Sequence, residues 1–189
     1  MQSKQHFHLR DIILLALIGI IFAVIYFGAD FIYNALTVAL SPIGYGPAAN
    51  DITMGIWCMA GTLSGFLLRK PGAGFLGEFL AAAIETFMNG QWGAANFISG
   101  FVQGVATELG FTVTDYKIYN WLTVVTTSLF AAVITFGWDW FKNGYSHFAP
   151  AMQISLFIIR FISIFIFSGV LVKLIANLLE RAHVVRKGY

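Results

Sequence analysis

The run IILLALIGIIFAVIYFGADFIYNALTVAL (residues 12–40) contains 29 residues and a single charged side chain, Asp30. A helix needs about 20 apolar residues to cross the hydrocarbon core of a bilayer. The run is therefore long enough to cross a membrane once and to continue beyond it, with a bend expected at Gly28-Ala29-Asp30. No small-residue cleavage site follows it, so we interpret it as a mature helix and not as a signal peptide.

The whole chain shares this apolar character. Of 189 residues, 58% are hydrophobic and 11% are charged, and the mean hydropathy is +0.77. A soluble domain has about a quarter of its residues charged. The composition therefore predicts an all-α, multi-pass protein of the cell membrane. The lone Cys58 excludes an intrachain disulfide framework.

Breaks at glycine, proline and charged clusters divide the chain into about six expected transmembrane helices. Their ranges are 11–40, 50–68, 72–89, 92–113, 120–141 and 150–180. The sequence shows no internal repeat, low-complexity tract or soluble segment. Residues 1–189 are thus expected to form a single integral-membrane domain, built as one helical bundle.

The basic residues predict the orientation of this bundle. If both termini are cytoplasmic, nine of the eleven lysines and arginines lie on or near the inner side, as the positive-inside rule requires. These nine are Lys4, Arg10, Arg69, Lys70, Lys117, Lys173, Arg181, Arg186 and Lys187. Segments 41–51, 89–92 and 142–149 are then external and rich in polar and aromatic residues. This pattern is typical of a protein that captures a solute from outside.

Ionisable residues within spans are costly in a membrane and usually face a cavity or a partner. Glu78 and Glu85 are seven residues apart, so they differ by only about 20° around a helix and share a face. Arg160 lies at a depth similar to that of Glu78, and a structural ion pair between the two is one interpretation. Glu85, nearer the external surface, is a candidate ligand-binding group. Glu108, near the cytoplasmic end, is expected to have a packing or interface role.

Depth and helical face select the other candidate substrate-binding residues. Asn96 lies one turn beyond Trp92, at the depth of Glu85, and Trp57 lies deeper than an interfacial aromatic belt usually reaches. Gln103 is a candidate too, although interhelical hydrogen bonding explains it equally well. The full predicted set is Tyr26, Asp30, Asn34, Trp57, Glu85, Asn89, Trp92, Asn96 and Gln103.

Small residues form two kinds of pattern. Gly61 with Gly65, and Gly100 with Gly104, are G-x-x-x-G pairs that allow two helices to pack closely within the protein. A smooth strip on the first helix, made of Ala16, Gly19 and Ala23, is either internal packing or a surface that faces lipid or another subunit.

Several catalytic and nucleotide-binding motifs are absent from the sequence. It has no G-x-x-x-x-G-K-[ST] loop, and therefore no ATPase activity of its own is expected. It also lacks H-E-x-x-H, G-x-S-x-G and paired His or Cys at metal-ligand spacing. We expect no catalytic residue, no metal site, no cofactor and no nucleic-acid partner.

Four segments resemble the YkoE family, the substrate-binding S components of energy-coupling factor (ECF) transporters. They are RKPGAGFLGEFLAAAIETFMNGQWG (69–93), SGFVQGVATELGF (99–111), FGADFIYNAL (27–36) and PIGYGPAANDITMGIW (42–57). The resemblance implies a six-helix subunit of a prokaryotic membrane that captures thiamin or its precursor hydroxymethylpyrimidine near the external face. It also implies docking on a transmembrane T component that carries two cytoplasmic ATPases. Ala16, Gly19 and Ala23 correspond to the family's docking surface, whose usual Ala-x-x-x-Ala is Gly19-x-x-x-Ala23 here.

Two other functions compete with substrate capture. A stand-alone proton-coupled carrier would use the buried acids as proton relays, but such carriers commonly contain inverted repeats, which this sequence lacks. An intramembrane enzyme would use Glu78 and Glu85 as acid and base, but the sequence offers no nucleophile or metal site. The sequence leaves open which vitamin is bound and whether the energising module is dedicated or shared.

Overall fold

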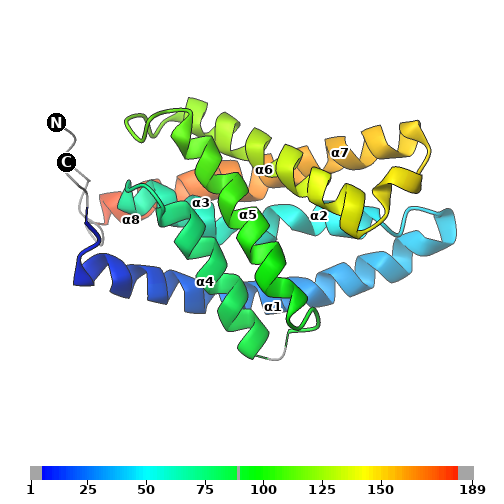
Figure 1. The fold of residues 1–189 in the computed structure, drawn as a ribbon, viewed down its shortest axis with the longest axis horizontal. Coiled ribbons are helices and arrows are strands. Elements are labelled where there is room, and N and C mark those ends of the chain that lie inside the picture. Colours follow the sequence, from blue (N-terminus) through cyan, green and yellow to red (C-terminus); the bar gives the residue numbers. More distant parts are fainter. Residues whose placement is uncertain (1–5, 89, 183–189) are drawn as a thin grey trace.

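The computed structural model describes residues 6–88 and 90–182, and the regular structure in these ranges is entirely helical. The α-helices are α1 (Leu9–Leu40), α2 (Ala48–Trp57), α3 (Met59–Leu68), α4 (Ala73–Phe87), α5 (Ala95–Thr112), α6 (Trp121–Lys142), α7 (Pro150–Ile164) and α8 (Val172–Arg181). Two short 3₁₀ turns, η1 (Ser41–Ile43) and η2 (Tyr145–His147), and a π-helical segment, η3 (Phe165–Leu171), complete the list. Figure 1 shows how these elements are arranged.

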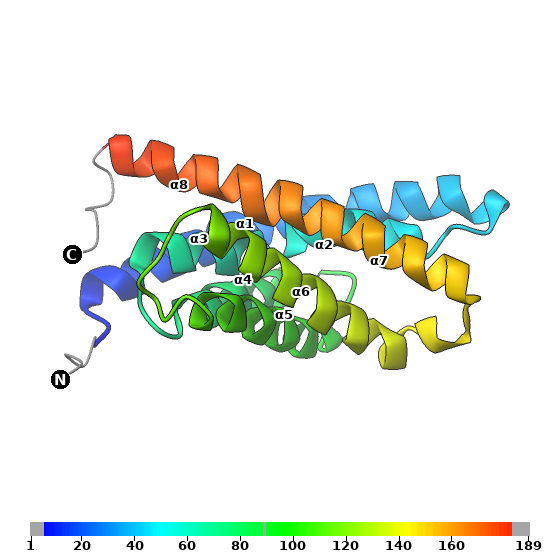
Figure 2. The ribbon, with the colours of Figure 1, turned by 90° about the horizontal axis from the view of Figure 1, so that it is seen from above.

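Four continuous segments are long and apolar enough to cross a membrane. They are Leu9–Ile43, Ala48–Leu68, Trp121–Lys142 and Pro150–Arg181. The last consists of α7, η3 and α8, which form one unbroken rod (Figure 2). The prediction of an all-helical membrane protein is therefore confirmed. The first helix stays α-helical through residues 28–30, where a bend was expected.

Helices α4 and α5, which have 15 and 18 residues and lie outside these four segments, run diagonally across α1 (Figure 1). They occupy the third and fourth ranges expected from the sequence, so the six expected ranges all contain helix. The beginning of α1 and the end of α8 lie at the same end of the bundle (Figure 1). That six spans cross the bilayer, with both termini in the cytoplasm, stays a prediction.

The second of these four segments, Ala48–Leu68, is interrupted between α2 and α3. Cys58 has φ −108° and ψ 8°, and α3 restarts immediately after it. The first N–H groups of α3 need partners from outside their own helix. The Ala60 N–H donates to Tyr26 Oη at 2.9 Å, and the Gly61 N–H donates to Glu78 Oε2 at 2.8 Å. Non-helical backbone at membrane depth is tolerated where protein groups satisfy it in this way.

Tyr26 and Glu78 also bind each other, because Tyr26 Oη donates to Glu78 Oε1 at 2.8 Å. Both carboxylate oxygens of Glu78 therefore serve the start of α3, and the side chain is fully buried. This carboxylate joins α1, α3 and α4. Glu78 thus has a structural role, although its partner is not the expected one.

The two glycine pairs allow helices to approach closely, as expected from the sequence. A Cβ on Gly65 would lie 2.2 Å from the ring of Phe111, and one on Gly100 would lie 2.4 Å from the Cβ of Ala82. Neither position can hold a larger residue without displacing its neighbour. These glycines pack α3 against α5 and α4 against α5.

The strip on α1 that the sequence predicts as a docking surface is divided between two environments, and its docking role stays a prediction. Ala16 is exposed. Gly19 is buried against α4, where an added Cβ would lie 3.2 Å from Ile84 and 3.3 Å from Leu80, and Ala23 is fully buried. Gly19 and Ala23 are therefore internal packing residues. Their spacing placed them on one face with Ala16, but α4 covers most of that face.

Candidate functional site

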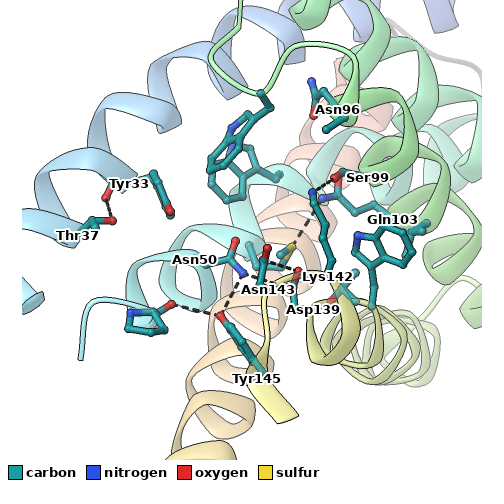
Figure 3. Close-up of a pocket in the computed structure, with 18 of the residues that line it drawn as sticks. Tyr33, Thr37, Asn50, Asn96, Ser99, Gln103, Asp139, Lys142, Asn143 and Tyr145 are labelled. Atoms are coloured by element: carbon teal, nitrogen blue, oxygen red, sulfur yellow. Dashed lines mark hydrogen bonds between the residues drawn. The ribbon is translucent and has the colours of Figure 1, made fainter. Parts of the chain in front are cut away.

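A cavity of about 450 Å³ lies among α1, α2, α5 and α6 and the connections that join helices (Figure 3). This volume is within the range of roughly 300–1,000 Å³ that small-molecule sites occupy. The lining residues are Tyr33, Thr37, Ser41, Gly46, Pro47, Asn50, Met54, Trp57, Trp92, Ala95, Asn96, Ser99, Val102, Gln103, Thr135, Trp138, Asp139, Lys142, Asn143, Tyr145 and Phe148.

One part of the cavity wall is aromatic. Tyr33 on α1 lies 5.8 Å from Trp57 and 5.1 Å from Trp92, measured between ring centroids. Trp57 and Trp92 are 6.0 Å apart and nearly perpendicular. The break after Trp57 ends α2 at this point, and Trp92 comes from the connection between α4 and α5. Three such rings can hold a flat heteroaromatic ligand by stacking and edge contacts.

Another part of the wall is polar and centres on Asp139, near the end of α6. Asp139 Oδ2 accepts from Asn50 Nδ2 at 2.8 Å, and Oδ1 accepts from Asn143 Nδ2 at 2.7 Å. Figure 3 shows Asn50, Asp139, Asn143 and Tyr145 gathered here, with Asn96 on the far side of the cavity. The two sides of the cavity therefore differ in chemistry.

Arg160 lies behind this polar wall and corrects the expected Glu78–Arg160 ion pair. Its Nε donates to Asp51 Oδ1 at 2.6 Å, and its Nη2 donates to Asp139 Oδ2 at 2.5 Å. The side chains of Arg160 and Asp51 are fully buried. Depth in the membrane suggested Glu78 as the partner, but α7 packs against α2 and α6, and Glu78 faces α1 and α3.

Tyr145 anchors the connection between α6 and α7 to this network. Its hydroxyl donates to Asp51 Oδ2 at 3.0 Å and accepts from Asn50 Nδ2 at 3.2 Å. Burial, together with the nearby Asp51 carboxylate, raises the pKa of the Tyr145 phenol. The phenol therefore remains protonated, and a donor, at neutral pH.

Four of the predicted substrate-binding residues line the cavity: Trp57, Trp92, Asn96 and Gln103. For Trp57, the structure favours the cavity over the interfacial belt. Gln103 also reaches Met54, with 3.8 Å between Nε2 and Sδ.

Two predicted acids are buried one layer behind the wall. Glu85 Oε2 accepts from Asn96 Nδ2 at 2.7 Å, and Asp30 Oδ1 accepts from Trp92 Nε1 at 2.9 Å. Neither acid is among the lining residues. Each instead accepts a hydrogen bond from a lining residue, and the ligand-binding role predicted for Glu85 stays a prediction.

The remaining predicted residues lie elsewhere. Tyr26 is buried at the start of α3, and Asn34 is exposed and donates to Gln91 Oε1 at 2.9 Å. Neither lines the cavity. Asn89 lies outside the described residues, so its predicted role is not tested.

Sequence reasoning did not select several lining residues, notably Tyr33, Asn50, Trp138, Asp139, Lys142, Asn143 and Tyr145. A signal existed for most of them, because they lie in or beside the segments expected to be external. Nothing in the sequence indicated that the start of α2 packs against the end of α6 and the α6–α7 connection. Only the packing of these elements brings the seven residues together.

Comparisons with known proteins agree with this architecture. A family model described as the permease component of an ABC-type cobalt transport system matches residues 10–134. YkoE of Bacillus subtilis (strain 168), named as an HMP/thiamine permease protein, is 29% identical over 168 residues, which cover 89% of this chain and 82% of YkoE. A crystal structure of an S-component of an ECF transporter matches with a TM-score of 0.88 and 28% identity, covering 95% of this chain and 88% of that one.

The helical membrane fold, the solute-sized cavity and these matches define the class: the chain is a transporter component and not an enzyme. It belongs to the family of ABC-type cobalt transport system permease components, because that family model covers well over half of its length. The resemblance of its sequence to the YkoE family of ECF S components is confirmed.

Proposed function

We propose that this chain is the substrate-capture subunit of an ATP-driven ECF importer and that its cavity binds hydroxymethylpyrimidine or thiamin near the external face of the membrane. The observation that carries the proposal is the cavity itself, with three aromatic rings on one side and a hydrogen-bonded polar wall on the other. The name of the related Bacillus subtilis protein supports this substrate class.

The ligand's pyrimidine ring is proposed to lie among Tyr33, Trp57 and Trp92. Asn96, beside this cluster, then lies within reach of a polar ring substituent, such as the exocyclic amine. Glu85 holds Asn96 in place and does not itself contact the ligand. A longer ligand such as thiamin would extend from the rings towards Asn50 and Asn143.

This cavity suits a heteroaromatic ligand better than a bare metal ion, although the family description names cobalt. Its lining supplies rings, amides and hydroxyls. Within residues 6–88 and 90–182, no group of three or more His, Cys, Asp or Glu side chains is placed to hold a metal. We therefore expect that cobalt ions, added in place of the vitamin, do not bind to the protein.

Import would need partners, because the sequence has no nucleotide-binding loop. A T component with two cytoplasmic ATPases would supply this energy. Docking on the T component is proposed to use the exposed apolar face of α1, which includes Ala16, Leu17 and Ile20. Gly19 and Ala23 are no longer part of that proposal.

Isothermal titration of the purified chain with hydroxymethylpyrimidine, thiamin and cobalt tests the substrate class. Binding of either vitamin with a one-to-one stoichiometry is expected, and binding of neither contradicts the proposal. Mass spectrometry of co-purifying ligands would then distinguish the two vitamins. Gradient-driven uptake by the chain alone in liposomes would favour the stand-alone carrier instead.

A further inference from the structure

Three buried carboxylates share one feature: each accepts hydrogen bonds from N–H groups of residues that line the cavity. Glu85 accepts from Asn96, and Asp30 accepts from Trp92. Asp139 accepts from both Asn50 and Asn143. These N–H groups are therefore already occupied by protein acceptors, two of which lie behind the wall and one of which, Asp139, is part of it.

This pairing fixes the orientation of the cavity asparagines. The Asp139 carboxylate is paired with Arg160 and only accepts hydrogen bonds, so the amides of Asn50 and Asn143 that face it must present their NH₂ groups. Asn96 Nδ2 uses its second hydrogen on the Ala82 carbonyl at 3.0 Å, and Asn50 Nδ2 uses its second on Tyr145 Oη. The amide oxygens of Asn50, Asn96 and Asn143 remain, and none receives a hydrogen bond from the described part of the chain.

Behind the wall, two acceptor oxygens are left unused by the part of the chain that the structure describes. Glu85 Oε1 and Asp30 Oδ2 are buried and have no hydrogen-bond partner among the described residues. Trp138 Nε1 is a buried donor in the cavity wall that also lacks a partner there, and Lys142 donates to Ser99. At Asn50, Asn96 and Asn143 the cavity therefore offers a ligand amide oxygens, while Lys142, Trp138 and the lining hydroxyls supply donors elsewhere in the wall.

We propose that Asp30, Glu85 and Asp139 are positioning residues that determine specificity: by occupying the N–H donors of Trp92, Asn50, Asn96 and Asn143, they make these parts of the cavity select ligand groups that donate hydrogen bonds. This inference rests on the proposed function. Under it, Asn96 accepts from the pyrimidine amine beside the aromatic rings. Asn50 and Asn143 accept from a hydroxyl group at the opposite side.

Asp139→Asn is a sharp test because of Arg160. The new amide oxygen must accept from the guanidinium, so the new NH₂ group faces Asn143 and requires that side chain to turn its oxygen inward. Asn143 then presents N–H to the cavity. Asp51 still pairs with Arg160, so the ion pair that joins α7 to α2 remains. Glu85→Gln tests the other side, because the new amide can present its NH₂ group to Asn96, and only the Ala82 carbonyl then favours the present orientation of the Asn96 amide.

The experiment measures affinity ratios by isothermal titration for two matched ligand pairs. The first pair is thiamin and its analogue with a methoxy group in place of the pyrimidine amine. The second is thiamin and its analogue with a methyl ether in place of the terminal hydroxyl. We expect the wild-type protein to prefer the donor-bearing member roughly ten- to hundredfold in each pair. Glu85→Gln should reduce the first ratio to a few fold, and Asp139→Asn should reduce the second.

Glu78→Gln is the matched control, because it makes the same change in a buried acid that supports no cavity residue. It should leave both ratios unchanged. If Asp139→Asn does not fold, Asn143→Ala, at an exposed position, should lower the second ratio without touching the ion pair. Equal loss of affinity for both members of a pair, with an unchanged ratio, overturns the inference. Failure of the wild-type protein to bind thiamin or hydroxymethylpyrimidine instead overturns the proposed function.

Discussion

Arg160 and Asp51 form an ion pair of 2.6 Å in which neither side chain is accessible to solvent. The guanidinium also binds Asp139 and lies 5.3 Å from the ring centroid of Phe136. One cation therefore joins α7 to α2 and α6 directly behind the polar wall of the cavity. Since Asp139 also binds Asn50 and Asn143, the same network that joins the helices sets the shape of the proposed site.

Replacing Arg160 with Met should strongly destabilise the protein, because two buried acids lose their cation. Removing one partner of a buried pair costs about 3–5 kcal/mol. Thermal unfolding in detergent measures the effect. Lys117→Met is the control, because Lys117 pairs with Asp115 at a site where the two side chains are 73% and 61% exposed, and a surface pair is worth about 0–1 kcal/mol. Equal losses for the two variants would show that the buried network contributes nothing special.

Glu78→Gln should lower thermal stability and have a smaller effect on ligand affinity. The amide turns one accepting oxygen into a donor, which then faces either the Tyr26 hydroxyl or the Gly61 N–H. An unsatisfied buried group costs about 1–3 kcal/mol. Tyr26→Phe removes the same link, so the double variant should lose less than the sum of the single losses. Additive losses would show that the two residues act independently.

Gly19→Leu should destabilise the isolated subunit, because the new side chain meets Leu80 and Ile84 on α4. Overpacking of this kind costs about 1–3 kcal/mol. Ala16→Leu, on the exposed face of the same helix, should change stability by less than about 0.5 kcal/mol. Assembly with the T component, measured by co-purification, should be reduced in Ala16→Leu. Unchanged stability in Gly19→Leu would mean that α4 does not cover this face.

Trp57→Ala should weaken ligand binding by roughly tenfold or more, because a stacking surface and its buried area are lost. Trp140→Ala is the control, since Trp140 packs on Phe136 and does not line the cavity. Isothermal titration gives both affinities. A larger effect at Trp140 would place the site elsewhere.

The predicted orientation is tested by cysteine labelling in a Cys58→Ala background. Ser146→Cys, in the exposed connection between α6 and α7, should react with an impermeant thiol reagent added outside intact cells. Lys117→Cys, in the exposed connection between α5 and α6, should react only after the cells are opened. The reverse pattern would place the cavity entrance on the cytoplasmic side.

The sequence by itself determined the helical membrane architecture and the approximate limits of the six helical ranges. Apolar runs and their interruptions are local properties, so ranges such as 92–113 lie close to the observed α5, Ala95–Thr112. The expected depth of each residue in the membrane also identified Trp57, Trp92 and Asn96 as cavity residues. The interruption at Cys58 was not predicted, because the residues that stabilise it, Tyr26 and Glu78, come from two other helices.

Only the tertiary structure decided which faces of the helices meet. Spacing along a helix gives the depth of a residue and the face it shares, but it does not give the rotation of that helix against its neighbours. Arg160 and Glu78 therefore seemed to match in depth, yet they point to different helices. Glu85 and Asn96 were both assigned to the ligand, but the packing of α4 against α5 places Glu85 behind Asn96, where its carboxylate orients the amide.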